Sequence, residues 1–140
     1  MNEVLTVPPL IVQFRQRTLP KAEWTHAAHL QVGLWHVLHY APEEALWRLR
    51  EGICRLNESH GTANTDEGGY HETITRFYVL WIGQFARQRG PERGFDALAK
   101  ELVAAAGDNK TPLQHYSSQT LFSKAARLGW VEPDLKPLDA

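Results

Sequence analysis

Four histidines lie within one short apolar stretch, EWTHAAHLQVGLWHVLHYAP, at residues 23–42. A helix that is apolar nearly all round is usually buried, and a buried imidazole needs a hydrogen-bond partner or a bound ion. The helical period places His26 and His29 side by side, with an axial rise of about 4.5 Å between them. His36 lies roughly 10 Å further along the axis than His29. His26 and His29 are therefore the pair that could converge on one atom.

A second group of polar residues begins the helix expected over residues 70–89, YHETITRFYVLWIGQFARQR. On a helical wheel, His71 falls near the apolar stripe of this helix, so its side chain is expected to point toward the core. Glu72 lies on the flank shared with Arg76. This position indicates either an i,i+4 ion pair with Arg76 or a carboxylate that orients a ligand histidine and transfers protons.

Combining the two groups predicts a metal site in which His26, His29 and His71 supply three neutral nitrogens. Three histidines with an open fourth position suit a divalent transition metal such as zinc, iron, nickel or copper. With Glu72 as the catalytic acid or base, a metal-bound water would make the protein a hydrolase-like enzyme. Glu23, one turn before His26, is a rival fourth ligand.

Two other functions are compatible with the same residues. The first is a metal-free binding module for a small anionic ligand, whose charge Arg76 and the N-terminus of the 70–89 helix would hold. Trp24, Tyr70 and Tyr116 would hold the apolar part of that ligand, and Asn57 would add a hydrogen bond. The second is a structural or interaction protein with an interface between copies of the chain. Its histidines would only form hydrogen bonds within the core. The usual zincin, phosphate-loop and serine-hydrolase motifs are absent from the sequence.

Prolines at helix starts and glycines at helix ends divide the chain into elements. The expected helices cover residues 8–17, 20–41, 42–61, 70–89 and 91–106, with a short sixth element from 111. No segment shows sustained two-residue alternation of apolar and polar side chains. The sequence therefore predicts a single-domain, all-α bundle of five to six helices over residues 1–140, with an extended C-terminal tail from about residue 130.

Four stretches resemble motifs of a group of small, uncharacterised bacterial all-helical proteins. They are WTHAAHL, GYHETITRF, YSSQTLFSKAARLGW and EPDL, the last within WVEPDL, and they occur in the same order. The resemblance covers most of the chain from about Leu19 onward. It implies a helical fold and supplies no activity.

The composition narrows the class of partner. Fifteen basic residues against sixteen acidic ones leave no net field that would attract nucleic acid or an anionic membrane. The single cysteine, Cys54, cannot form an internal disulfide, and its place in an apolar rhythm predicts a buried thiol. The sequence shows neither a secretory signal nor an apolar run long enough to span a bilayer. These features predict a cytoplasmic protein with a small-molecule ligand.

Overall fold

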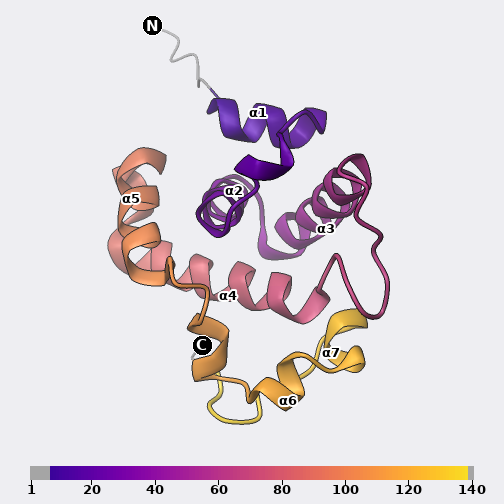
Figure 1. Ribbon diagram of the computed structural model, residues 1–140. Helices are drawn as coiled ribbons and strands as arrows, with labels where there is room; N and C mark the ends of the chain where they lie inside the picture. Colours follow the sequence, from indigo (N-terminus) through magenta and orange to yellow (C-terminus); the bar gives the residue numbers. More distant parts are fainter. Residues whose placement is uncertain (1–6, 139–140) are drawn as a thin grey trace, which may run out of the picture.

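The computed structural model describes residues 7–138, and this part of the chain is helical, without strands (Figure 1). The α-helices are α1 (Pro9–Gln16), α2 (His26–His39), α3 (Pro42–Ser59), α4 (Glu72–Arg89), α5 (Phe95–Ala106), α6 (Ser118–Leu121) and α7 (Lys124–Leu128). Short 3-10 turns cover η1 (Lys21–Glu23), η2 (Pro91–Arg93) and η3 (Thr111–Gln114). The all-α prediction is confirmed. None of the described helices is long and apolar enough to cross a membrane.

Helix α2 begins later than the sequence predicts. The segment after Pro20 forms the 3-10 turn η1, and Thr25 then caps α2 by accepting a hydrogen bond from the backbone N–H of Ala28 at 3.2 Å. A threonine at this position satisfies one of the backbone donors that a helix start leaves free. The cap places His26 and His29 in the first turn of the helix.

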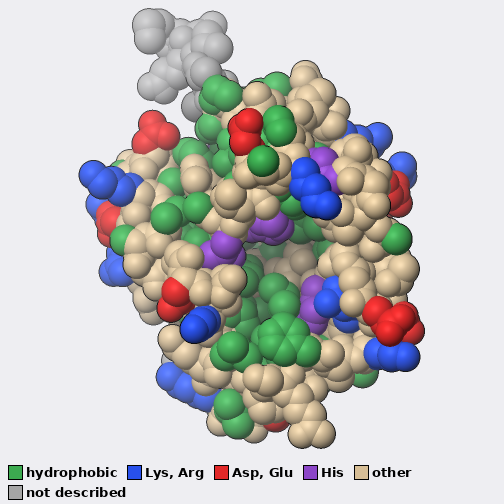
Figure 2. Space-filling view, viewed as in Figure 1, with side chains coloured by type: hydrophobic (Ala, Val, Ile, Leu, Met, Phe, Trp, Pro, Cys, Tyr) green, Lys and Arg blue, Asp and Glu red, His purple; other side chains and the backbone are tan. Residues whose placement is uncertain are grey.

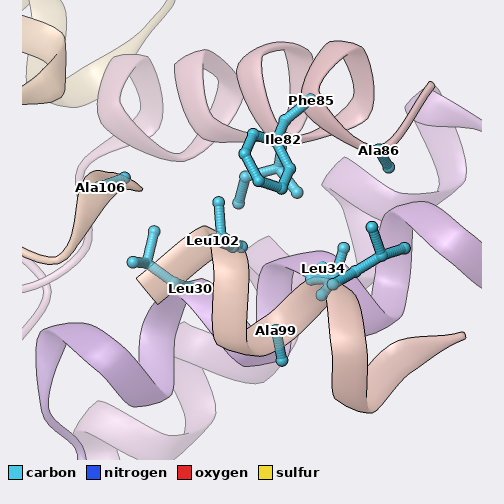
Figure 3. Close-up of a cluster of buried hydrophobic side chains, with 9 residues drawn as sticks. Leu30, Leu34, Ile82, Phe85, Ala86, Ala99, Leu102 and Ala106 are labelled. Carbon is cyan, nitrogen blue, oxygen red and sulfur yellow. The ribbon is translucent and has the colours of Figure 1, made fainter. Parts of the chain in front are cut away.

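Helix α4 runs through the middle of the fold and contacts α2, α3, α5 and α7 (Figure 1). One face of α4 packs with α2 and α5 in a buried hydrophobic cluster (Figure 3). The members of this cluster are Leu30, Leu34, Ile82, Phe85, Ala86, Leu98, Ala99, Leu102 and Ala106. A second cluster joins α1, α2 and α3, with Ile11, Phe14, Val32 and Leu56 fully buried. A third, formed by Phe77, Tyr116 and Leu121, joins α4 to the C-terminal elements.

Two glycines allow close approach between helices. A Cβ atom at Gly33 of α2 would lie 3.1 Å from Cδ1 of Ile82 on α4. A Cβ atom at Gly52 of α3 would overlap the ring of Phe14, which seats α1 on α3. Helix α4 therefore packs closely against α2 at Gly33.

The chain from α7 onward is tied to the segment just before and at the start of α4. The hydroxyl of Thr73 donates to the carbonyl of Gly129 at 2.7 Å, and the guanidinium of Arg127 donates to the carbonyl of Gly69 at 2.9 Å. Tyr116 donates from its hydroxyl to the carbonyl of Val131 at 2.6 Å. Residues 130–138 contain neither helix nor strand. We call residues 118–131 the C-terminal clasp.

Candidate functional site

A cavity of about 230 Å³ lies between α2, α3 and α4, and we call it the first cavity. Figure 2 shows a hollow on this face of the molecule, with histidine and hydrophobic side chains around it. The lining residues are His26, His29, Leu30, Gly33, Leu49, Ile53, Ile74, Thr75, Tyr78 and Val79. Most of these side chains are hydrocarbon. The cavity therefore suits an apolar group that meets a small number of polar atoms.

A second cavity, of about 240 Å³, adjoins the first. The two share His29, Ile53, Ile74 and Thr75. The remaining residues of the second cavity are Trp24, Asn57, Thr62, Gly69, Tyr70 and His71. The shared residues come from α2, α3 and α4, so the same three helices position both cavities.

His29 is held in a fixed orientation at the junction of the cavities. Its Nδ1 lies 2.7 Å from the carbonyl oxygen of Thr25, and its ring stacks on the indole of Trp24 with centroids 3.6 Å apart. Because a carbonyl can only accept, Nδ1 carries the proton and Nε2 keeps a lone pair. His29 lines both cavities, and part of the residue is exposed to solvent.

The surrounding protein keeps His29 neutral. Desolvation lowers the pKa of His29 to about 4, which outweighs the opposing effect of the hydrogen bond to Thr25. Nearby His26 acts in the same direction as desolvation. At neutral pH the ring thus presents a hydrogen-bond acceptor and no charge to the cavities.

His26 lines the first cavity and is anchored to a different helix. Its Nε2 lies 2.9 Å from the carbonyl oxygen of Ala106 at the end of α5. Its ring centroid lies 5.8 Å from that of Tyr78. Nδ1 of His26 makes no hydrogen bond with the described residues, so His26 and His29 each keep one ring nitrogen available.

His71 is placed differently from the predicted metal ligand. Its Nε2 donates to the carbonyl of Leu121 at 2.7 Å, and its Nδ1 accepts the backbone N–H of Ile74 at 3.1 Å, which makes His71 the N-cap of α4. Both ring nitrogens are therefore occupied. The ring lines the second cavity and not the first. Across residues 7–138, no group of three potential metal-ligating side chains could hold an ion.

Glu72 is paired with α3. Its carboxylate accepts hydrogen bonds from Nε and Nη2 of Arg50 at 2.8 and 2.6 Å and from the hydroxyl of Tyr70 at 2.7 Å. Burial raises the pKa of Glu72, but the bonds from Arg50 and Tyr70 outweigh it and leave the pKa below its ordinary value. The i,i+4 partner considered from the sequence, Arg76, instead places its guanidinium 4.8 Å from the centre of the Trp130 ring. Glu72 is not among the residues that line either cavity.

Three of the five predicted ligand-binding residues, Trp24, Asn57 and Tyr70, line the second cavity, and Arg76 and Tyr116 line neither. Of the other candidates, Tyr116 is fully buried in the third hydrophobic cluster, and Glu23 lies in the exposed turn η1.

The loop before α4 is held by an asparagine pair. Nδ2 of Asn57 donates to Oδ1 of Asn64 at 3.0 Å, and the same oxygen accepts the backbone N–H of Tyr70 at 3.0 Å. Gly69 has φ of +79°, and a Cβ atom there would overlap the backbone of Ala63. A side chain at position 69 would therefore disturb the wall of the second cavity.

Sequence reasoning did not assign the apolar walls to the site. Leu49 and Ile53 lie four residues apart on α3, and Ile74 and Val79 lie on α4. In the sequence they are ordinary members of apolar stripes, and only the gap between three helices distinguishes them from core residues. Thr62, in the polar loop, was also not assigned.

Comparison of the chain with models of protein families, with curated proteins and with solved structures gave no match.

Proposed function

We propose that the protein binds a small, uncharged and largely apolar molecule in the first cavity, without a metal ion. The observation that carries this proposal is the placement of His29, a neutral imidazole anchored by Thr25 and Trp24 at the edge of an apolar cavity. Its free Nε2 would accept a hydrogen bond from a hydroxyl or amide group of the ligand. An apolar cavity with a small number of oriented polar groups is the usual arrangement of a small-molecule site.

The size of the first cavity is sufficient for a ring or a short branched chain. A dry, apolar cavity of roughly 150 Å³ binds benzene in a well-studied engineered protein, and the first cavity measures about 230 Å³. Burial of apolar ligand surface contributes roughly 25 cal/mol per Å². The hydrophobic effect would therefore supply most of the affinity, and His29 would add selectivity.

Charge favours an uncharged ligand over the anionic ligand considered from the sequence. Among the described residues, no lysine, arginine, aspartate or glutamate lines either cavity. Arg76, the predicted partner of an anion, lies over Trp130. A charged ligand would lose its hydration without gaining a counter-charge.

Binding is also better supported than acid–base catalysis. A general base works best when its pKa is near the working pH, and the pKa of His29 is about 4. The metal-dependent hydrolase stays a prediction. It would require a third ligand beside His26 and His29, because both nitrogens of His71 already bind backbone groups.

The proposal can be tested with ethylbenzene as the probe and a variant that fills the cavity. Ile53 borders both cavities and is only partly buried, so Ile53→Trp can place its larger side chain in the open space. We expect saturable binding of ethylbenzene to the wild type, with shifts of the methyl NMR signals of Leu49 and Val79. Ile53→Trp should lose at least tenfold in affinity for ethylbenzene, because a tenfold change corresponds to only about 1.4 kcal/mol of binding free energy.

The matched control is Leu80→Trp, which adds the same side chain at a residue of α4 that is 39% exposed and lines neither cavity. This variant should bind ethylbenzene like the wild type. Absence of saturable binding to the wild type, or equal affinity in Ile53→Trp and the wild type, would contradict the proposed function.

A further inference from the structure

We propose that the natural ligand has two parts, an apolar group in the first cavity and an uncharged hydroxyl- or amide-bearing head in the second. This inference rests on the proposed function of the first cavity and extends it to the class of ligand. The four shared residues, His29, Ile53, Ile74 and Thr75, are where the two parts of the ligand would join.

The volumes of the two cavities indicate a ligand that extends into both. Sites for small molecules usually measure about 300–1,000 Å³. The first cavity, at about 230 Å³, and the second, at about 240 Å³, each fall below that range, whereas the two together lie within it. A ligand of ordinary metabolite size would have to enter both.

The two cavities also differ in the polarity of their walls. Beyond the shared residues, the second cavity is lined by Trp24, Gly69 and the polar side chains of Asn57, Thr62, Tyr70 and His71, whereas the first adds Leu30, Gly33, Leu49 and Val79 with the two polar rings of His26 and Tyr78. The polar side therefore suits a head group that can form hydrogen bonds, and the apolar side suits a hydrocarbon group.

Some polar atoms of the second cavity are already hydrogen-bonded within the protein, and others are free to bind a ligand. The hydroxyl of Tyr70 is used by Glu72 and both nitrogens of His71 are used by backbone groups. Within residues 7–138, Oδ1 of Asn57 and the hydroxyl of Thr62 make no hydrogen bond, although Nδ2 of Asn57 is bound to Asn64. Asn57, Thr62 and the indole N–H of Trp24, which also makes no hydrogen bond within the described residues, are therefore the groups of the second cavity that can bind a head group.

The junction fixes the direction of the hydrogen bonds. The hydroxyl of Thr75 donates to the carbonyl of His71 at 2.8 Å, so it has no proton left for a ligand. Nε2 of His29 is an acceptor because Nδ1 carries the proton. Oδ1 of Asn57 is also an acceptor. To bind these two acceptors the head group needs a donor, which a hydroxyl or an amide N–H supplies and a carboxylate or ether does not, whereas the hydroxyl of Thr62 can either donate or accept.

The test compares two probes of nearly equal shape, hydrocinnamyl alcohol and butylbenzene, which differ by a hydroxyl in place of a methyl group. The informative variant is Thr62→Val, which keeps the shape of the side chain and removes its hydroxyl. We expect Thr62→Val to lower the affinity for hydrocinnamyl alcohol by about two- to tenfold, which corresponds to the loss of one net hydrogen bond. Its affinity for butylbenzene should stay the same.

Thr18→Val is the matched control, because Thr18 is exposed and lines neither cavity. It should change neither affinity. In the wild-type protein, the alcohol should also shift the NMR signals of Thr62 and Asn57, which gives a readout that does not depend on the folding of a variant.

The outcomes separate the two proposals. If ethylbenzene binds but the alcohol shifts only NMR signals of the first cavity, the two-part ligand is wrong and the proposed function stands. The same conclusion follows if Thr62→Val lowers the affinity for the alcohol and for butylbenzene equally. If none of the three probes binds the wild type, both proposals are wrong.

Discussion

At the start of α2, His29 uses one ring nitrogen on the carbonyl of Thr25 and keeps the other at a cavity. At the start of α4, His71 uses both ring nitrogens on backbone groups, one from Ile74 and one from Leu121. The difference lies in the surroundings, since α6 brings a carbonyl to His71 from a point 50 residues further along the chain. A histidine near a cavity is thus available for binding only if no such carbonyl reaches its second nitrogen.

The charged groups differ between the two helix starts in the same way. Beside His71, the carboxylate of Glu72 is bound by Arg50 and Tyr70, with only 13% of the Glu72 side chain exposed. This ion pair ties α3 to α4 outside the cavities. Within the described part of the chain, no carboxylate or guanidinium lines the cavities beside His29. The polar groups at the start of α4 therefore stabilise the fold, whereas the start of α2 leaves Nε2 of His29 free to bind a ligand.

The largest expected effect that tests this contrast is on stability. His71→Ala removes the N-cap of α4 and leaves the carbonyl of Leu121 without its partner, so it should reduce the free energy of unfolding by roughly 2–4 kcal/mol. His29→Ala loses one local hydrogen bond and an aromatic stack, and should cost roughly 1 kcal/mol. Urea unfolding measures both.

His71→Asn is the control, since asparagine keeps a capping side chain and loses the reach to Leu121, and it should fall between wild type and His71→Ala. If His29→Ala were as destabilising as His71→Ala, the contrast between the two helix starts would be wrong.

The second effect is a loss of stability in acid. Burial lowers the pKa of His36 to about 4, with Arg15 and Arg48 acting in the same direction against the bond to Val32, and the pKa of His29 is also lowered to about 4. Below the ordinary histidine pKa of 6.5 the unfolded chain then binds more protons than the folded one. The free energy of unfolding should be highest above pH 6.5 and fall as the pH falls toward 4.

For the buried His36, the slope is on the order of 1 kcal/mol per pH unit. His29 adds in the same direction, with a smaller effect because solvent reaches its cavity. Urea unfolding at several pH values checks this, and His36→Phe should flatten the profile. A protein that became more stable between pH 6.5 and pH 4.5 would show that neither histidine is kept neutral by the fold.

The smallest expected effect is the response to a chelator. If His26 and His29 bind an organic ligand and no metal, EDTA should leave the melting temperature unchanged, and untagged protein should contain far less than one metal ion per chain. Elemental analysis and melting curves measure this. One tightly bound ion per chain, lost in His29→Ala, would restore the metal site predicted from the sequence and contradict the proposed function.

The sequence predicted the helical class well because helix signals are local. The apolar spacing of α3 and α4 and the prolines at the first turns of α1 and α3 identify those helices. The start of α2 was placed at Pro20 because a proline and a threonine are both good start signals, and only the bond from Ala28 to Thr25 distinguishes them. Helices α6 and α7 have serine caps, at Ser117 and Ser123, which the sequence reading did not use.

The site was less accessible to sequence reasoning because its partners are tertiary. Helical spacing correctly placed His26 and His29 together. It could not show that Arg50, 22 residues before Glu72, holds that carboxylate, or that Leu121 reaches His71. The position of a side chain on a helical wheel gives its direction, whereas its availability depends on groups that other helices bring to it.

The C-terminal clasp has a consequence for the motions of the protein. It is attached to residues 69–73 by the bonds from Arg127, Thr73 and His71, and residues 69–71 also form part of the wall of the second cavity. Local unfolding of the clasp would therefore open that wall in the same event. A ligand that binds only the closed form reduces the opened population by the factor 1 + [L]/Kd. Amide hydrogen exchange in α6 and α7, which lie outside the cavities, would slow as the ligand binds.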